Sequence, residues 1–257
     1  MLSFQEKIIK AATLLKSAEN ITAFTGAGIS TESGISDFRS KGGVWDRYRI
    51  VTYQEFIASH DARVEYWQMK KELYNEIKDA RPNAAHLALA ELEHMGRLNC
   101  LITQNIDGLH QDSGSSHVIE IHGTNRKAVC LDCGKLWPIE DVQKWLESGE
   151  NDPSCDNCNG YVKPATISFG QSMPVAEMAR AFECAAACDL LLMIGSSLQV
   201  EPAASIPGEA HAKGAKLIYI NRTETATDHM AEVCFRENAG QVLGELVKTL
   251  KRGINTT

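Results

Sequence analysis

Residues 21–30 read Ile-Thr-Ala-Phe-Thr-Gly-Ala-Gly-Ile-Ser, an apolar run that leads directly into a glycine-rich turn. A short apolar run without alternation is typical of a strand that is buried on both faces of a parallel sheet. Gly26 and Gly28 permit a tight turn whose backbone amides can approach a pyrophosphate, where a helix N-terminus would add partial positive charge. The stretch therefore predicts the first strand of an α/β sheet and an anion-binding turn at its end.

Further runs of the same kind recur along the chain between helix-like segments. The predicted strands cover residues 98–103, 118–121, 190–194, 216–220 and 233–235. Apolar residues have helical spacing in three segments, 5–18, 84–95 and 240–250, with predicted buried stripes of Ile8, Ile9, Ala12 and Leu15 in the first and Leu87, Ala88 and Leu92 in the second. Strands that alternate with helices predict an α/β sheet with helices on both faces.

Two stretches break this rhythm. Residues 36–82 carry many aromatic and charged positions, with helical spacing in their second half. Residues 125–163 contain paired cysteines among Gly, Pro, Asp and Asn, with too few apolar residues to bury a core of their own. We expect both stretches to be insertions into the α/β unit.

Composition and charge argue against several classes of protein. The chain has 257 residues, of which 44% are apolar, enough for one large domain or for a large and a small one. Its 26 basic and 33 acidic residues give a formal charge of -7, which disfavours general nucleic-acid binding. The longest strongly apolar stretch, residues 190–194, is far shorter than the ~18 residues that cross a bilayer. The first residues also lack a signal-peptide pattern, so we expect a cytoplasmic protein.

The eight cysteines are the unusual feature of the composition. Cys130 and Cys133 form one C-x-x-C pair and Cys155 and Cys158 form another, with 21 residues between the pairs. Two such turns can present four thiolates to one zinc ion at about 2.3 Å, which leaves no position open for a substrate. A redox-active thiol pair would need only one such turn, so we predict a structural zinc site. The remaining cysteines are interpreted as small core residues without assigned chemistry: Cys100, Cys184, Cys188 and Cys234.

Two polar motifs follow the ends of predicted strands. Residues 103–110 read Thr-Gln-Asn-Ile-Asp-Gly-Leu-His, and Ile121-His122-Gly123 ends the next run. Polar groups at the carboxyl ends of strands lie where open α/β sheets bind ligands, and an imidazole with a pKa of about 6.5 can accept a proton near neutrality. The alternatives are a capped polar loop for the first motif and a structural histidine for the second.

The glycine-rich turn departs from the usual dinucleotide-binding fingerprint. A third glycine, Gly34, comes three residues later than that fingerprint places it, and no acidic residue follows at the usual strand end. These departures argue against a hydride-transferring dehydrogenase.

Taken in order, these motifs resemble the sirtuins, a family of NAD-dependent protein-lysine deacylases, over nearly the whole chain. Further segments carry the resemblance: Gly-Ile-Ser-Asp-Phe-Arg at 34–39, Lys163-Pro164, Phe169-Gly170, Gly-Ser-Ser-Leu-Gln-Val-Glu-Pro-Ala at 195–203 and Ile220-Asn221. Tyr66-Trp67, residues 81–86 and Cys-Leu-Asp-Cys-Gly at 130–134 are most similar to the class II branch, which includes a mitochondrial lipoamidase and ADP-ribosyltransferase.

The resemblance implies three parts of the chain. Residues 1–35, 96–124 and 165–257 would form a Rossmann-like NAD-binding domain, residues 36–95 a cofactor loop with a helical module, and residues 125–164 a zinc-binding module. NAD and an acyl-lysine protein or peptide would bind in the cleft between them. The implied protein is a monomer that uses NAD as co-substrate and zinc for structure, with no membrane or direct nucleic-acid partner.

The resemblance also implies roles for individual residues. His122 and Asn105 would be catalytic, with His122 accepting a proton from the ribose hydroxyls. Phe38 and Arg39 would lie in a mobile cofactor loop, and Asp107 would hold the nicotinamide carboxamide. The implied NAD contacts are Gly26, Ala27, Gly28, Ser30, Asp37, Phe38, Arg39, Trp45, Gln104, Asn105, Ile106, Asp107, Gly195, Ser196, Ser197, Asn221 and Ala239. The implied substrate contacts are Ser168, Phe169, Gly170, Val200 and Glu201.

In the reaction that the resemblance implies, the acyl oxygen of the substrate lysine attacks C1′ of the nicotinamide ribose. Nicotinamide leaves and the acyl group is transferred to ADP-ribose. The peptide would add as a strand between residues 168–171 and 198–201, so that main-chain hydrogen bonds supply the affinity.

Three positions depart from the family pattern and bear on substrate choice. Ser36 replaces a proline in the cofactor loop, while Ser168 and Gln171 differ beside the expected peptide strand. Tyr48 and Arg49 are adjacent and would point apart, so no preference for acidic acyl groups is assigned. Deacetylation is the leading expectation. Protein mono-ADP-ribosylation, long-chain or lipoyl deacylation, and a non-catalytic NAD-sensing module are the alternatives.

Overall fold

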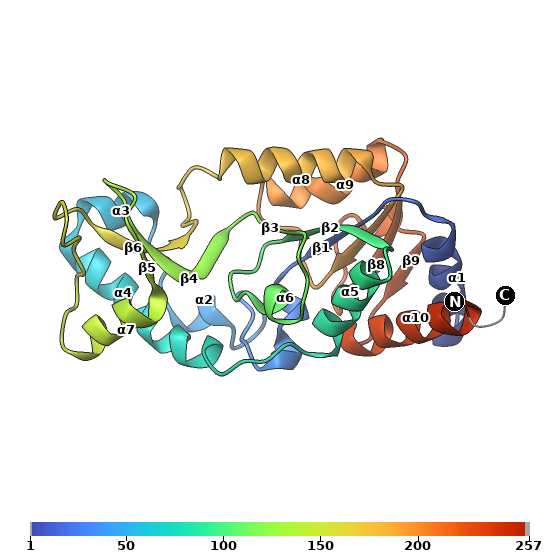
Figure 1. The fold of residues 1–257 in the computed structure, drawn as a ribbon, viewed down its shortest axis with the longest axis horizontal. Coiled ribbons are helices and arrows are strands. Elements are labelled where there is room, and N and C mark those ends of the chain that lie inside the picture. Colours follow the sequence, from blue (N-terminus) through green and yellow to red (C-terminus); the bar gives the residue numbers. More distant parts are fainter. Residues whose placement is uncertain (1, 255–257) are drawn as a thin grey trace.

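The apolar runs form a six-stranded sheet in which every strand pairs in parallel, in the order β3-β2-β1-β7-β8-β9. The computed structural model describes residues 2–254, and this sheet lies in the larger of its two lobes (Figure 1). The predicted parallel sheet is confirmed, and only β3 ends one residue earlier than predicted. The strands are β1 (Ile21–Thr25), β2 (Leu98–Thr103), β3 (Val118–Glu120), β7 (Leu190–Ile194), β8 (Lys216–Ile220) and β9 (Val233–Phe235).

Helices cover both faces of this sheet (Figure 1). Apolar side chains of α1 (Phe4–Ser17), α5 (Ala84–His94) and α10 (Ala239–Ile254) pack on one face. Those of α8 (Val175–Ala187) and α9 (Ile206–Ala212) pack on the other. Short helical segments lie in the connections: α6 (Leu109–Asp112), η1 (Ala27–Ile29), η2 (Thr31–Ser33), η3 (Ala203–Ser205) and η4 (Asp228–Met230). No helix among residues 2–254 is long and apolar enough to span a membrane.

Two residues of the predicted helical stripes do not reach the core. Ile9 is 55% exposed and Leu87 is 54% exposed, whereas their neighbours Ile8 and Ala88 are buried. Consecutive helical residues are about 100° apart around the axis, and Ile9 and Leu87 fall outside the arc of their helices that faces the sheet. The prediction was therefore wrong for Ile9 and Leu87.

The second lobe consists of the two insertions. The first holds α2 (Val44–Arg47), α3 (Tyr53–Ala58) and α4 (His60–Ile77). The second holds an antiparallel sheet in the order β5-β4-β6, with β4 (Gly123–Cys130), β5 (Leu136–Pro138), β6 (Val162–Thr166) and the helix α7 (Ile139–Glu147). Trp67 of α4 is only 2% exposed and packs in the apolar cluster of the second insertion. Eight of the nine buried residues of this cluster come from the cysteine-bearing insertion, which has more core of its own than predicted, and Trp67 of the helical insertion completes it.

Helix α5 lies inside the stretch 36–95 that the sequence assigned to the helical module. Its residues Leu89 and Leu92 belong to the core of the large sheet, and its main helical neighbour is α10. We therefore propose that the helical module ends before Ala84, where α5 begins.

Cys100 and Cys184 lie in or against the apolar core, as interpreted, but the expectation that they carry no chemistry was wrong. Cys100 of β2 and Cys184 of α8 form a disulfide, with their Cα atoms 6.4 Å apart. The two residues are 84 positions apart in the chain and meet only because α8 packs over this part of the sheet, so spacing alone gives no sign of the pair. Cys188 and Cys234 remain free thiols. The cytoplasmic location stays a prediction.

The strand order reverses between β1 and β7, which are neighbours in the middle of the sheet. In open α/β sheets, ligands bind in the crevice outside the carboxyl ends of the strands at such a switch point. The glycine-rich turn follows β1, and the segment at Gly195 follows β7 at the same edge. The fold therefore places both motifs at the position where a ligand is expected.

Candidate active site

A cavity of about 790 Å³ opens at this edge of the sheet. Segments after β1, β2, β7 and β8 line one side, and α4 with residues 166–171 lines another. Ser30 and Asp107 instead line a smaller cavity of about 50 Å³ that shares wall residues with the large one. All other predicted catalytic, NAD and substrate residues line the large cavity: Gly26, Ala27, Gly28, Asp37, Phe38, Arg39, Trp45, Gln104, Asn105, Ile106, His122, Ser168, Phe169, Gly170, Gly195, Ser196, Ser197, Val200, Glu201, Asn221 and Ala239.

The glycine-rich turn packs directly against the turn after β7. The N–H of Gly28 donates to the carbonyl of Gly195 at 2.8 Å, and that of Gly26 donates to the carbonyl of Ile194 at 3.0 Å. A Cβ on Gly28 would lie 2.8 Å from Gly195 Cα, so a side chain there would separate the two turns. The backbone amide of Ala27 has no partner among residues 2–254 and is the one left to meet an anion.

The sequence predicted a helix N-terminus after the glycine-rich turn, but no long helix follows this turn. Two short 3₁₀ segments, η1 and η2, follow Gly26 instead. Each has only three residues, so the helix-dipole contribution to phosphate binding expected from the sequence is small here.

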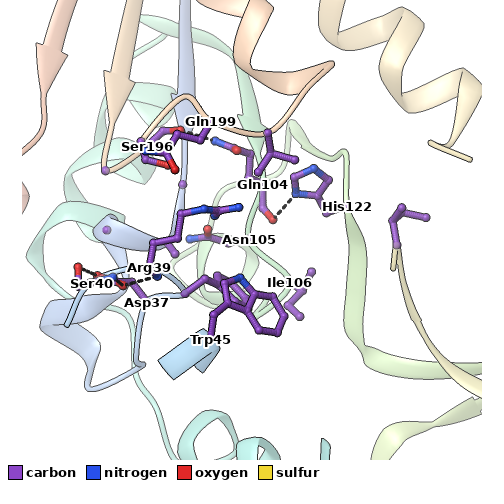
Figure 2. Close-up of a pocket in the computed structure, with 18 of the residues that line it drawn as sticks. Asp37, Arg39, Ser40, Trp45, Gln104, Asn105, Ile106, His122, Ser196 and Gln199 are labelled. Carbon is purple, nitrogen blue, oxygen red and sulfur yellow. Dashed lines mark hydrogen bonds between the residues drawn. The ribbon is translucent and has the colours of Figure 1, made fainter. Parts of the chain in front are cut away.

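His122 is held in a single tautomer at the cavity wall. Its Nδ1 lies 3.0 Å from the carbonyl oxygen of Gln104, a group that can only accept, so Nδ1 carries the proton (Figure 2). No described residue hydrogen-bonds to Nε2. Burial lowers the pKa of the imidazole, and the charge of Arg39 lowers it further against the opposing effect of the Gln104 carbonyl. At neutral pH His122 therefore offers an unprotonated Nε2 as a base.

A chain of hydrogen bonds fixes the polar motif after β2. The Ser30 hydroxyl donates to Asp107 Oδ2 at 2.7 Å and accepts from Asn105 Nδ2 at 3.1 Å. His86 Nδ1 accepts the N–H of Asn83, so Nε2 carries the proton and donates to Ser30 Oγ at 3.4 Å. One hydroxyl thus orients both the amide of Asn105 and the carboxylate of Asp107.

A second chain of hydrogen bonds supports the same motif through the threonines at the ends of β1 and β2. His110 Nε2 lies 2.9 Å from the hydroxyl of Thr25, which donates to Thr103 Oγ1 at 2.8 Å. Thr103 Oγ1 in turn accepts the N–H of Asn105 at 3.0 Å. Burial, reinforced by the neighbouring His86, lowers the pKa of His110 to about 3. The imidazole is therefore neutral, with its proton on Nε2 and its buried Nδ1 unpartnered.

The cofactor loop covers one side of the cavity. Asp37 Oδ1 accepts the backbone N–H groups of Arg39 and Ser40, so the carboxylate shapes the loop (Figure 2). The rings of Phe38 and Trp45 lie 5.3 Å apart, and Trp45 also contacts Phe169 with ring centroids 5.8 Å apart. Trp45 thus links the cofactor loop to the segment predicted to bind the peptide.

The opposite wall is polar. Gln104 Nε2 donates to Ser196 Oγ at 2.8 Å, which joins the segments after β2 and β7. The side chain of Asn221 donates to the carbonyl of Thr223 at 2.9 Å and so shapes the loop after β8. Ser197 lines the cavity beside these groups.

Neither predicted peptide-binding segment is a strand in this structure. In the first, the carbonyl of Phe169 accepts the N–H of Tyr53 at 2.9 Å, and that of Gly170 accepts Gln54 Nε2 at 2.9 Å. A peptide that adds between the two segments must therefore use other backbone groups or displace these bonds. Strand addition stays a prediction.

The sequence analysis assigned no chemistry to a cluster behind residues 166–171. Lys163 is 1% exposed, and its Nζ donates to the carbonyl of Thr166 at 2.5 Å. Burial raises the pKa of the Tyr66 phenol, but the charges of Lys163 and Lys70 outweigh burial and bring it to about 7. Tyr66 and Lys70 line the large cavity. Tyr66 and Lys70 are four residues apart on α4, which is an ordinary helical spacing. Only the fold therefore shows that Lys163 lies beside them.

The four paired cysteines converge as predicted. Their Sγ atoms all lie within 4.8 Å of one another, and no other group of this kind occurs in the part of the chain described. Cys130 and Cys158 Sγ are 3.5 Å apart, and Cys133 and Cys155 Sγ are 3.7 Å apart. Four sulfurs at about 2.3 Å from a tetrahedral ion would be about 3.8 Å apart, so the cluster fits zinc with all four positions filled by protein.

Comparison with known proteins gives consistent results along the whole chain. A model of the Sir2 family matches residues 26–202. An NAD-dependent protein deacetylase of Thermodesulfovibrio yellowstonii is 53% identical over 250 residues, which cover 97% of this chain and 98% of that protein. An NAD-dependent protein deacylase 2 of Archaeoglobus fulgidus is 39% identical over 252 residues, which cover 96% of this chain and 98% of that protein.

A solved structure has the same fold. It is described as Sir2 with a p53 peptide and NAD+, and it superposes with a TM-score of 0.84. The two proteins are 33% identical, and the match covers 96% of this chain and 98% of that one. At 33% identity, the two proteins are similar in sequence as well as in fold.

Proposed function

The chain belongs to the Sir2 family, and from this premise we propose that it is an NAD-dependent protein-lysine deacylase, with deacetylation as its main activity. The reaction transfers the acyl group of a lysine to ADP-ribose and releases nicotinamide. The relatives named above as NAD-dependent deacetylase and deacylase, which align over almost their whole length, support this activity.

The observation that carries the proposal is the state of His122. Its Nδ1 proton is fixed on the carbonyl of Gln104 and its pKa lies below the usual value, so Nε2 is a free base in the large cavity. A base in this position is what the acyl transfer needs, because a ribose hydroxyl must lose its proton to attack the acyl carbon. No protein nucleophile is required, since the acyl oxygen of the substrate itself attacks the ribose.

We further propose how the surrounding residues act. Asn105 is oriented by Ser30 and by Thr103, and its Oδ1 accepts no hydrogen bond from residues 2–254, which leaves it for a ribose hydroxyl. The ring of Phe38, packed on Trp45, would exclude water from the reacting sugar after nicotinamide leaves. The amide of Ala27 and the hydroxyl of Ser197 would meet the phosphates.

The partner is an acyl-lysine side chain on a protein or peptide. The p53 peptide in the solved relative supports this class of substrate. We also propose that the protein acts as a cytoplasmic monomer. The four cysteines would hold one zinc ion, which supplies structure to the second lobe and takes no part in the reaction.

The direct test is incubation with labelled NAD and an acetyl-lysine peptide. Free lysine, nicotinamide and O-acetyl-ADP-ribose support the proposal, whereas label on protein without deacetylation favours mono-ADP-ribosylation. His122→Ala separates an enzyme from a non-catalytic NAD-binding module, because only an enzyme loses turnover in this variant. A panel of acetyl, long-chain, lipoyl and succinyl peptides then establishes the acyl preference and tests the similarity to the lipoamidase branch.

A further inference from the structure

One guanidinium group joins the two ends of the loop that follows β8. Arg236 comes directly after β9, and its Nη1 donates to the carbonyl of Asn221 at 3.0 Å, where the loop begins. Its Nη2 donates to the carboxylate of Asp228 at the start of η4, where the loop ends. Arg236 therefore restricts how far the two ends of residues 221–228 can separate.

The carboxylate of Asp228 also holds the inside of this loop. Its Oδ1 accepts the backbone N–H of Thr225 at 3.1 Å and the Thr225 hydroxyl at 2.7 Å. Burial raises the pKa of Asp228, but the hydrogen bonds from Thr225 and Arg236 outweigh burial and bring it below its usual value. The carboxylate is therefore charged near neutrality, and hydrogen bonds to a charged acceptor are stronger than those between neutral groups.

The pair of Arg236 and Asp228 lies behind the wall of the large cavity. Residues 221–224 line this cavity, whereas neither member of the pair does. Within the same loop, Arg222 Nη2 donates to Asn238 Oδ1 at 2.8 Å and so joins the loop to the segment after β9. Arg236 and Asp228 can thus act on a bound ligand only through the loop that they hold.

The strand order places this loop at one end of the bound dinucleotide. The strands lie in the order β2-β1-β7-β8 across the middle of the sheet. Asn105 of the proposed reacting end follows β2, and the two turns proposed to meet the phosphates follow β1 and β7. NAD is a chain of nicotinamide ribose, two phosphates and adenosine. The loop after β8 therefore lies on the far side of the phosphates from the reacting sugar, beside the adenosine half.

We propose that Arg236 and Asp228 are positioning residues for NAD, which hold the loop after β8 in the conformation that binds the adenosine half. The inference rests on the proposed function, in which NAD occupies the large cavity. A loop that is already ordered loses little conformational entropy when its ligand binds, so the pair raises the affinity for any ligand that carries this half. It determines the KM for NAD and leaves the chemistry at the reacting sugar unchanged.

Calorimetry with ADP-ribose tests the proposal without turnover, because ADP-ribose has the adenosine half and the phosphates but no nicotinamide. A hydrogen bond is worth about 3- to 10-fold in affinity, so Arg236→Met should weaken ADP-ribose binding and raise the KM for NAD by about 3- to 10-fold. The kcat at saturating NAD and the KM for an acetyl-lysine peptide should not change. Asp228→Asn should weaken ADP-ribose binding as well, and the double variant should lose less than the product of the two single effects, since both remove one shared contact.

Lys10→Met is the matched control. Lys10 Nζ donates to the carbonyl of Glu232 at 2.8 Å and pairs with its carboxylate at 3.1 Å, just before β9 and outside both cavities. This variant also loses a cation that bonds to one carbonyl and one carboxylate, and it should bind ADP-ribose as the wild type does.

A folded Arg236→Met protein that binds ADP-ribose as tightly as the wild type would overturn the proposal. Equal increases in the KM for NAD and for the peptide would also overturn it, because they would indicate a general loss of structure. If Arg236→Met does not fold, Arg236→Lys, which can keep only one of the two contacts, serves for the same comparison. A wild type that binds ADP-ribose but does not deacetylate the peptide would refute the proposed function alone, and the calorimetry would still decide the role of Arg236.

Discussion

Trp67 is predicted to hold the second lobe together. The side chain reaches from α4 into the cluster formed by Ala128, Trp137, Val142 and their neighbours, and it is only 2% exposed. The cysteine-bearing insertion supplies the other eight buried residues of this cluster, and the Trp67 ring is the buried side chain that α4 adds to them. We predict that Trp67→Ala destabilises the second lobe far more than Trp67→Phe does.

The magnitude follows from the buried ring. A buried aromatic side chain removes 150–250 Å² from water, which at ~25 cal/mol per Å² corresponds to about 4–6 kcal/mol. Truncation to alanine keeps the Cβ, and comparable substitutions cost about 3–5 kcal/mol. Trp67 Nε1 has no hydrogen-bond partner, so Trp67→Phe loses no hydrogen bond and should cost only about 1–2 kcal/mol.

Urea unfolding followed by tryptophan fluorescence measures this difference. Trp137 and Trp145 lie in the lobe with their rings 5.8 Å apart, and they remain in both variants. Because both variants lack Trp67, their signals come from the same three tryptophans and can be compared directly. Equal unfolding midpoints for Trp67→Ala and Trp67→Phe would refute the idea that the lobe depends on this ring.

Three further predictions concern other parts of the molecule. Cys155→Ser should lose bound zinc and deacylase activity together, by metal analysis and peptide assay, and a fully active zinc-free variant would contradict this. Gly195→Ala should cost about 2–4 kcal/mol and weaken NAD binding, since φ is +63° and the new Cβ would lie 2.4 Å from the nitrogen of Ile29. Gly208→Ala, in open space within α9, should raise stability by up to about 1 kcal/mol and leave NAD binding unchanged in the same assays. The buried His110 has a pKa of about 3, below its ordinary 6.5, so the unfolded state binds its proton first. Unfolding free energy should therefore fall as the pH drops from about 6.5 toward 3, by up to ~1.4 kcal/mol per pH unit, and His110→Gln should reduce this slope in urea titrations.

The large sheet could be predicted closely because its strands are buried on both faces. Ile21–Thr25 and Leu190–Ile194 are continuous apolar runs bounded by turn residues, and their ends coincide with β1 and β7. The buried faces of the helices were predicted less accurately, because Ile9 and Leu87 are apolar yet exposed. The pattern of a single helix does not specify which of two adjacent apolar residues faces the sheet.

The site could be predicted where motifs follow strand ends, and not where residues meet only through the fold. His122 and the zinc cysteines stood out by position and spacing. In contrast, Lys163 meets Tyr66 because β6 packs against α4, and Cys100 meets Cys184 because α8 covers β2.

The central claim is that this protein transfers the acyl group of a substrate lysine to ADP-ribose, with His122 as the base. The most direct measurement is mass spectrometry of the products formed from NAD and an acetyl-lysine peptide, by the wild type and by His122→Ala. We predict equal amounts of deacetylated peptide, nicotinamide and O-acetyl-ADP-ribose from the wild type, and a loss of turnover of about 10²-fold or more in the variant. Wild-type rates in His122→Ala, or NAD consumption without any acetylated ADP-ribose, would contradict the account.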